Sequence, residues 1–188
     1  MNGVLPRGGN VPLMRENPGL KGVVFGVRFV TGAEKALADS LVVAAILCDG
    51  AAKAISPGHF VFFNQLASPD LSVRALEEAL GGDNEQIEVD LHDVPLEVSR
   101  IVVVLYVNEG TTARRTLGQL RSCMIRLLNL HGNTEMVRSE DLATGLVQET
   151  ALALGELYRH QGDWKFKVLG DGYAGGVTAV AGHYGVRL

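Results

Sequence analysis

This sequence has few cysteines, only a small excess of charge of one sign, and no long apolar run. Its 188 residues include two cysteines, Cys48 and Cys123, which lie in apolar stretches without a His or Cys at zinc-site spacing. We expect two buried, reduced thiols, because free cysteine is among the most buried residue types. No apolar run reaches the ~18 residues of a membrane helix, and no secretory signal pattern opens the chain. These absences predict a cytoplasmic protein with no transmembrane segment.

The charge balance argues against one large class of partner. Charged residues make up 20% of the chain, and the net charge is -4. A protein that binds nucleic acid needs a basic surface that displaces counterions from phosphates, so we expect no nucleic-acid partner. The mild acidic excess leaves carboxylates for a hard cation such as calcium.

Motifs that support catalysis are also missing. The histidines match neither the H-E-x-x-H nor the H-x-E pattern of metal-dependent enzymes, and no G-x-S-x-G elbow presents a serine nucleophile. The glycine-rich run Gly170–Gly176 follows an apolar strand pattern but lacks the Lys-Ser/Thr pair of a phosphate-binding loop. A closely packed turn explains it better. We therefore do not expect an enzyme.

What the sequence has in abundance is glycine, with 23 residues, and short apolar runs between turn residues. Gln86–Leu91 alternates apolar and polar residues, as a half-buried strand does. Ile101–Val107 is apolar throughout, as a central strand covered on both faces would be. The strands that these patterns predict are Leu20–Val30, Ser40–Cys48, His59–Phe63, Gln86–Leu91, Ile101–Val107, Ser122–Leu130, Thr150–Tyr158 and Trp164–Val168, the last two forming a hairpin.

Helical patterns are few and short. Val73–Leu80 has apolar residues at helical spacing, one or two helical turns are predicted within Thr112–Leu120, and a terminal helix is predicted at Val177–Tyr184. A parallel sheet needs long crossover helices, which this pattern lacks. The sequence therefore predicts a mostly β fold, a β-sandwich of two mainly antiparallel sheets with a few short peripheral helices. We expect one domain over residues 1–188.

Several motifs resemble those of a known family. Gly155–Phe166 reads GELYRHQGDWKF and Gly170–Gly176 reads GDGYAGG, similar to the signatures GELYRH-x-G-x-WKF and G-x-GY-x-GG of the tellurium-resistance TerD family. Phe60–Gln65 and Ser68–Asp70 are similar to its FVFYNN and SPD segments, and Gly8–Leu13 is similar to its opening. The resemblance covers nearly the whole chain. It implies a β-sandwich that holds calcium in acidic loops at one edge, a role in bacterial stress response, chiefly to tellurite, and no enzyme activity.

The resemblance places calcium ligands in the turn before Gln86. Asp83 and Glu85 keep the acids of the family's G-D-D-E-Q-I segment, and Asn84 replaces its second Asp with an amide. Calcium takes about six to eight oxygen ligands, so other loops must contribute. Asn64, which follows a predicted strand, could supply an amide oxygen. The alternative for each residue is a polar turn that bonds its own loop.

Other positions depart from the family's pattern. Where the family has D-x-D-x-D-A-S, this chain reads EKALADS over Glu34–Ser40, so two acids are alanines and Asp39 is shifted by one place. Asp39 is therefore a candidate ligand or a solvated turn residue. Glu109, which follows the strand Ile101–Val107, has the same two interpretations. The family's glycine-rich loop before G-D-D-E is shorter here and carries the predicted helix instead.

Two hypotheses about function stay open. The first is a non-enzymatic TerD-like protein of the tellurite and toxic-stress resistance type, with one weakened calcium site near Asp83, Glu85 and Asn64. The second is a calcium-independent interaction module derived from the same fold, which binds protein partners or a second copy of itself. The near full-length resemblance and the surviving G-D-N-E turn make the first the leading hypothesis. The alanines at Ala36 and Ala38 and the shortened loop favour the second, because fewer carboxylates weaken calcium binding.

Overall fold

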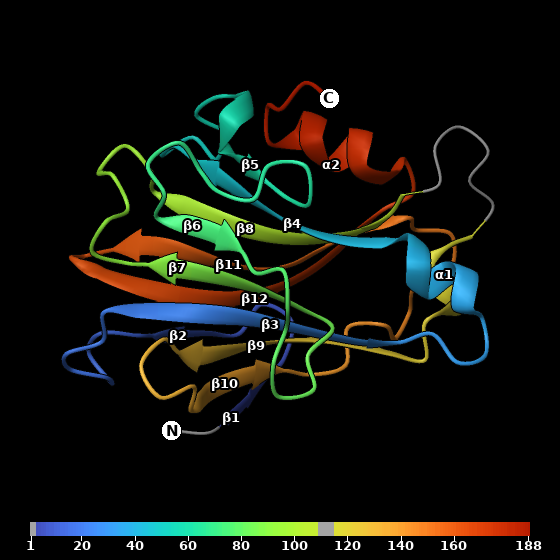
Figure 1. Cartoon of the computed structure of the whole chain (residues 1–188), viewed down its shortest axis with the longest axis horizontal. Helices are drawn as coiled ribbons and strands as arrows, with labels where there is room; N and C mark the ends of the chain where they lie inside the picture. Colours follow the sequence, from blue (N-terminus) through green and yellow to red (C-terminus); the bar gives the residue numbers. More distant parts are fainter. Residues whose placement is uncertain (1–2, 109–114) are drawn as a thin grey trace.

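Two six-stranded sheets pack face to face in the computed structural model (Figure 1), which describes residues 3–108 and 115–188. Sheet A has the strand order β1-β10-β9-β3-β7-β6, and sheet B has the order β2-β12-β11-β8-β4-β5. Within the described residues, neighbouring strands are antiparallel except for β1 and β10, which are parallel. The predicted sandwich of two mainly antiparallel sheets is confirmed.

The strands in chain order are β1 (Gly3–Leu5), β2 (Asn10–Pro12), β3 (Gly22–Val30), β4 (Leu41–Cys48), β5 (Phe60–Val61), β6 (Val73–Ala75), β7 (Glu85–Asp90), β8 (Arg100–Val107), β9 (Ser122–Asn129), β10 (Glu135–Ser139), β11 (Ala151–His160) and β12 (Asp163–Tyr173). Each predicted strand is present, although β5 is shorter and β12 longer than expected. The sequence patterns missed β1, β2, β6 and β10, because strands of three to five residues are too short to show a period.

The described helices are α1 (Lys35–Ser40) and α2 (Gly176–His183). The second confirms the predicted C-terminal helix, whereas α1 was not predicted. The predicted segment Thr112–Leu120 lies partly outside the described residues, and Leu117–Gln119 forms a 3-10 turn. No described helix combines the length and the apolar character needed to span a membrane.

The helix predicted at Val73–Leu80 is wrong. Val73–Ala75 forms β6, which pairs antiparallel with β7 opposite Val89 and Ile87. Val73 is fully buried in the core. Beyond β6 the chain continues as an irregular segment, and Leu76 in this segment still donates a backbone hydrogen bond to Gln86 of β7. A short apolar run suits a strand as well as a helix, and here the tertiary pairing decided between them.

Strand β8 shows how the sandwich is filled. Its Ile101, Val103 and Leu105 belong to the core between the sheets, whereas Val102 and Val104 lie on the other face of sheet B. On that face α2 packs against β8, β11 and β12 (Figure 1). Both faces of the strand are therefore covered, as its unbroken apolar run predicts.

The motif GELYRHQGDWKF forms the β11–β12 hairpin and fixes its neighbours. Gln161 and Gly162 have φ angles of 49° and 78°, and two positive φ values are typical of a type I′ hairpin turn. Arg159 donates to three backbone carbonyls between residues 94 and 98, and its guanidinium lies 4.3 Å from the centre of the Trp164 ring. Asp163 accepts hydrogen bonds from two backbone N–H groups that follow β2. These residues hold the hairpin against the neighbouring segments of the fold.

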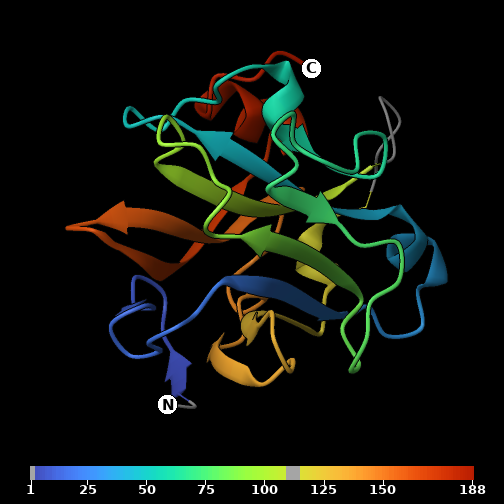
Figure 2. The same cartoon turned by 60° about the vertical axis from the view of Figure 1, so that its left-hand side comes forward.

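One side of the sandwich is left open. There sheet B ends in β5, with two residues, and sheet A ends in β6, with three. The chain passes from β5 in sheet B to β6 in sheet A along this side (Figure 2). Because β4 has eight residues, much of its outer edge extends beyond β5. This open side contains the candidate site.

Candidate functional site

A pocket of about 620 Å³ opens between β4 of sheet B and the β6–β7 edge of sheet A. We call it the edge pocket. Its volume lies within the roughly 300–1,000 Å³ of small-ligand sites. The residues that line it are Asp39, Leu41, Val42, Val43, Phe63, Leu66, Ala75, Leu76, Glu77, Glu85 and Asn108.

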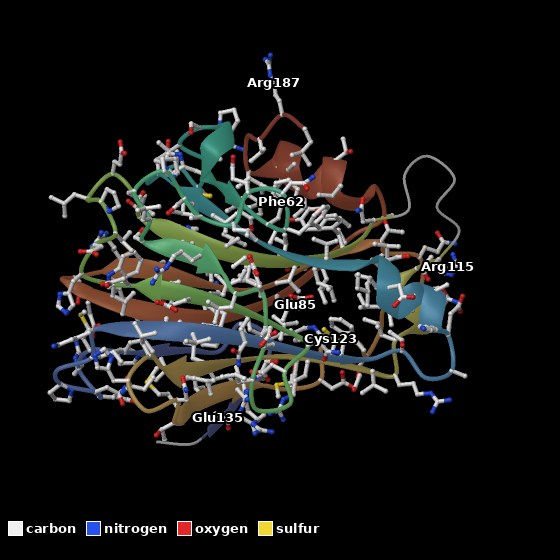
Figure 3. All side chains as sticks on the ribbon, in the orientation of Figure 1. Phe62, Glu85, Arg115, Cys123, Glu135 and Arg187 are labelled. Carbon is white, nitrogen blue, oxygen red and sulfur yellow. The ribbon has the colours of Figure 1, made fainter. Side chains whose placement is uncertain are left out.

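The polar part of the edge pocket is acidic. Asp39 comes from the end of α1, Glu77 from the segment after β6, and Glu85 from the start of β7. None of the described lining residues is basic, and within the described chain these three carboxylates accept no hydrogen bond and form no ion pair. Figure 3 shows Glu85 beneath β4, near the middle of the molecule. Burial raises the pKa of Glu85, because its charged form has lost water without gaining a cation.

The rest of the edge pocket is apolar. Phe63 and Leu66 lie in the connection between β5 and β6 and are 52% and 40% exposed. Leu41 and Val43 of β4 also line the pocket. Exposed aromatic and aliphatic side chains beside uncompensated carboxylates suit a ligand that is both cationic and apolar.

Asp83, the first predicted calcium ligand, is engaged elsewhere. Its Oδ1 accepts hydrogen bonds from Arg28 Nε (2.8 Å) and Arg126 Nε (2.9 Å). Its Oδ2 accepts from Arg126 Nη2 (3.0 Å) and Gln86 Nε2 (2.7 Å). A carboxylate has about four lone-pair sites, and here the protein occupies all of them. Gly26 lies against the same carboxylate, since an added Cβ would stand 2.2 Å from Oδ2.

The two predicted amide ligands, Asn84 and Asn64, do not line the edge pocket. The Asn84 side-chain oxygen accepts the backbone N–H of Phe29 (2.9 Å), and its own N–H donates to Val27 (2.9 Å), so it extends the pairing between β3 and β7. Asn64 is exposed at a tight turn in which Phe62 and Gln65 exchange backbone hydrogen bonds. Its neighbour in the turn, Phe63, lines the edge pocket, whereas Asn64 does not.

The structure therefore brings two predicted residues into one pocket, Glu85 and Asp39, and joins them with Glu77 and Asn108. It places Asp83 and Asn84 in backbone and ion-pair contacts, and Glu109 lies outside the described residues. Within residues 3–108 and 115–188, no three His, Cys, Asp or Glu side chains are arranged to hold one metal ion. Of the predicted ligands, Glu85 and Asp39 line the same pocket, whereas a calcium ion needs about six to eight oxygens, so calcium binding stays a prediction.

The sequence patterns missed two features of this region. Glu77 falls within the segment predicted as a helix, Val73–Leu80, and is not among the predicted ligands, but it lines the edge pocket. Arg28 and Arg126 were not weighed, although each is an arginine inside a largely apolar strand. A cation in such a strand signals a buried acid opposite, because buried charges are almost always paired. That signal would have assigned Asp83 to an ion pair.

Comparison with known proteins agrees with this fold. A model of the TerD domain matches residues 1–184. General stress protein 16U of Bacillus subtilis (strain 168) is 37% identical over 192 residues, covering 98% of this chain and 97% of that protein. Tellurium resistance protein TerD of Serratia marcescens is 36% identical over 187 residues, covering 97% of each. The crystal structure of a TerD homologue from Streptomyces coelicolor A3(2) has a TM-score of 0.63 at 18% identity, over 87% of this chain and 96% of that one. This chain belongs to the TerD family.

Proposed function

We propose that this protein acts in the stress response without enzyme activity, as an interaction module whose edge pocket binds a protein partner independently of calcium. The observation that carries the proposal is the edge pocket itself, where three carboxylates that meet no cation among residues 3–108 and 115–188 lie beside exposed Phe63 and Leu66. The names of the relatives, general stress protein and tellurium resistance protein, support the cellular setting.

The proposed lack of enzyme activity is supported by the surroundings of a serine–histidine contact. Ser56 Oγ lies 2.7 Å from His59 Nδ1, which superficially suggests a nucleophile and its base. However, Ser56 is the N-cap of a 3-10 turn, and its Oγ also accepts the Gly58 N–H (3.1 Å). His59 is buried at the end of that turn, so the contact acts as a cap.

Complementation in cells tests the proposed function. A strain that lacks the gene is given either the wild type or the double variant Phe63→Ser, Leu66→Ser, and survival in tellurite is measured. Both side chains are exposed, so the variant is expected to fold and to lose most of the protection. Leu96→Ser serves as the matched control, because Leu96 is 88% exposed and does not line the edge pocket. Full protection by the double variant contradicts the proposal.

A weakened calcium site is the second candidate function. It is favoured by Glu85, whose half-buried carboxylate meets no cation in the described part of the chain, and by Asp39, which lines the same pocket. Thermal unfolding of metal-stripped protein, with and without millimolar calcium, separates the two candidates. A ligand present at about 100 times its dissociation constant raises the midpoint of a domain this size by roughly 5–10 °C. We expect no calcium-selective shift against a magnesium control, and a shift that Glu85→Gln abolishes would favour the second candidate.

We also propose a cytoplasmic location. The support is that Cys48 and Cys123 are free and buried. Burial raises the pKa of both thiols to about 12, which makes them poor nucleophiles. Unpaired cysteines are the usual state in a reducing compartment. Fractionation with compartment markers tests this location, and recovery outside the cytoplasm contradicts it.

A further inference from the structure

Strand β4 presents part of its backbone edge to the edge pocket. It pairs with β8 along its whole length, but with β5 only at Ala45 and Ile46. Residues 41–44 therefore have a strand neighbour on one side only among the described residues. Three of these four residues line the edge pocket. Such an edge is a template for one more strand.

The register shows which backbone groups face the pocket. The carbonyl of Ser40 accepts a hydrogen bond from the N–H of Asn108 (2.7 Å), so it points toward β8. Backbone groups alternate in direction along a strand, so those of Leu41 and Val43 point to the opposite edge. The Leu41 N–H is already used by the last turn of α1. Among the described strands, none pairs with the carbonyl of Leu41 or with the backbone groups of Val43, so these groups could receive an added strand.

The side chains around this edge define what the added strand must carry. Glu85 shares its face of β7 with Ile87 and Val89, which belong to the core between the sheets, so it points toward the interior side of the pocket. Glu85, Asp39 and Glu77 supply negative charge, and Phe63 and Leu66 supply apolar surface. A strand presents alternate residues to opposite sides, so basic and apolar side chains in alternation would meet both kinds of surface.

We propose that the edge pocket binds an extended segment of another protein in which basic and apolar side chains alternate, and that this segment pairs with β4 at Leu41 and Val43. The inference rests on the proposed function and specifies its partner. In strand addition the main-chain hydrogen bonds supply affinity, and pockets for alternate side chains supply specificity. An acidic segment is disfavoured by the three carboxylates.

A second copy of this chain is a poor source of that segment. Its own stretch Trp164–Val168 alternates Trp, Phe and Val with lysines. That stretch lies in β12, which is paired with β11 on one side and with β2 on the other. Offering it to another molecule would dismantle sheet B, so the occupant is a different protein.

Fluorescence anisotropy with the full-length protein tests the proposal. The probe is a labelled eight-residue peptide of alternating valine and lysine. Glu85→Gln removes one charge and keeps the shape, and we expect it to weaken binding about tenfold, the value of one charge-assisted contact. Glu78→Gln is the matched control, since Glu78 is exposed, carries the same charge and does not line the edge pocket. It is expected to change the affinity by less than about twofold.

Three further peptides test the strand pairing. Glutamate in place of lysine is expected to abolish binding. N-methylation of every valine blocks one edge of the peptide, and N-methylation of every lysine blocks the other. One of these two peptides is expected to bind and the other is not, because β4 pairs with a single edge. Equal behaviour of the two methylated peptides, equal binding of the acidic peptide, or no binding at all overturns the proposal. In that case, loss of protection by the Phe63→Ser, Leu66→Ser variant would still support the proposed function with a different occupant.

Discussion

Asp83 and Glu85 are two residues apart in the chain, and their carboxylates have opposite surroundings. Asp83 is enclosed by Arg28, Arg126 and Gln86, and its side chain has no exposed surface. Glu85 lines the edge pocket and meets no cation among the described residues. The first carboxylate is held within the fold, and the second lines the pocket without a partner among the described residues. An acidic motif therefore indicates a site only after the cations around each acid have been located.

The largest expected effect comes from removing the paired acid. Asp83→Ala leaves Arg126, whose side chain is 10% exposed, without its main counterion. Breaking a buried ion pair in this way costs about 3–5 kcal/mol, and urea unfolding measures it. Asp39→Ala is the comparison, because Asp39 is exposed and unpaired within the described chain, and the expected change is within about 0.5 kcal/mol. Equal losses of unfolding free energy in Asp83→Ala and Asp39→Ala would show that the ion pairs of Asp83 do not stabilise the fold.

A smaller loss of stability is expected from adding a methyl group next to the Asp83 carboxylate and its two arginines. In Gly26→Ala the new Cβ would stand 2.2 Å from Asp83 Oδ2, so the carboxylate or strand β3 must shift. Overpacking of this kind costs about 1–3 kcal/mol. The control is Gly3→Ala, where an added Cβ meets no described atom within 4 Å. Thermal unfolding of the two variants should differ clearly, and similar midpoints would show that Asp83 is loosely held.

The smallest expected change in stability is a gain, and it comes from Glu85→Gln. Burial raises the pKa of Glu85, so the folded protein keeps this proton over a pH range in which the unfolded chain has released it. The resulting stability is fully present below the unfolded-state pKa of about 4.3, and it is lost as the pH rises through the raised folded-state pKa. Above that range Glu85→Gln should be more stable than the wild type by a few tenths of a kcal/mol, since solvent screens a half-exposed group.

Urea unfolding of wild type and Glu85→Gln across this pH range measures the effect. The advantage of the variant should shrink as the pH falls. An advantage that does not change with pH would mean that packing, not charge, separates the two proteins. Glu78→Gln should show no such trend, because Glu78 is exposed.

Much of the fold could be predicted from local pattern. The alternation in Gln86–Leu91 located β7 and its buried face, and the apolar run Ile101–Val107 located a strand covered on both sides. The segment Val73–Leu80 could not be assigned in the same way. Its apolar spacing fits a helix, but pairing with Ile87 and Val89 makes Val73–Ala75 a strand. That pairing joins residues from separate strands, and no local pattern records it.

Much less of the candidate site could be predicted. The sequence named Glu85 and Asp39, which line one pocket, but it grouped Glu85 with Asp83 because they are neighbours in the chain. Which oxygens are already bonded depends on Arg28 and Arg126, which come from β3 and β9. The cation that neutralises an acid is set by strand register across the sheet, and chain proximity does not show it.

By itself the sequence determined the sandwich and the buried face of its main strands, because apolar periodicity and turn residues act over a few neighbouring positions. The family resemblance rested on motifs such as GELYRHQGDWKF and GDGYAGG. Only the tertiary structure decided that Asp83 is paired, that Glu85 has no ion pair with any described residue, and that β4 extends past the described strand β5. Those outcomes depend on contacts between distant segments and on where the edge strands end. The same acidic turn therefore supplies one side chain to the fold and one to the pocket.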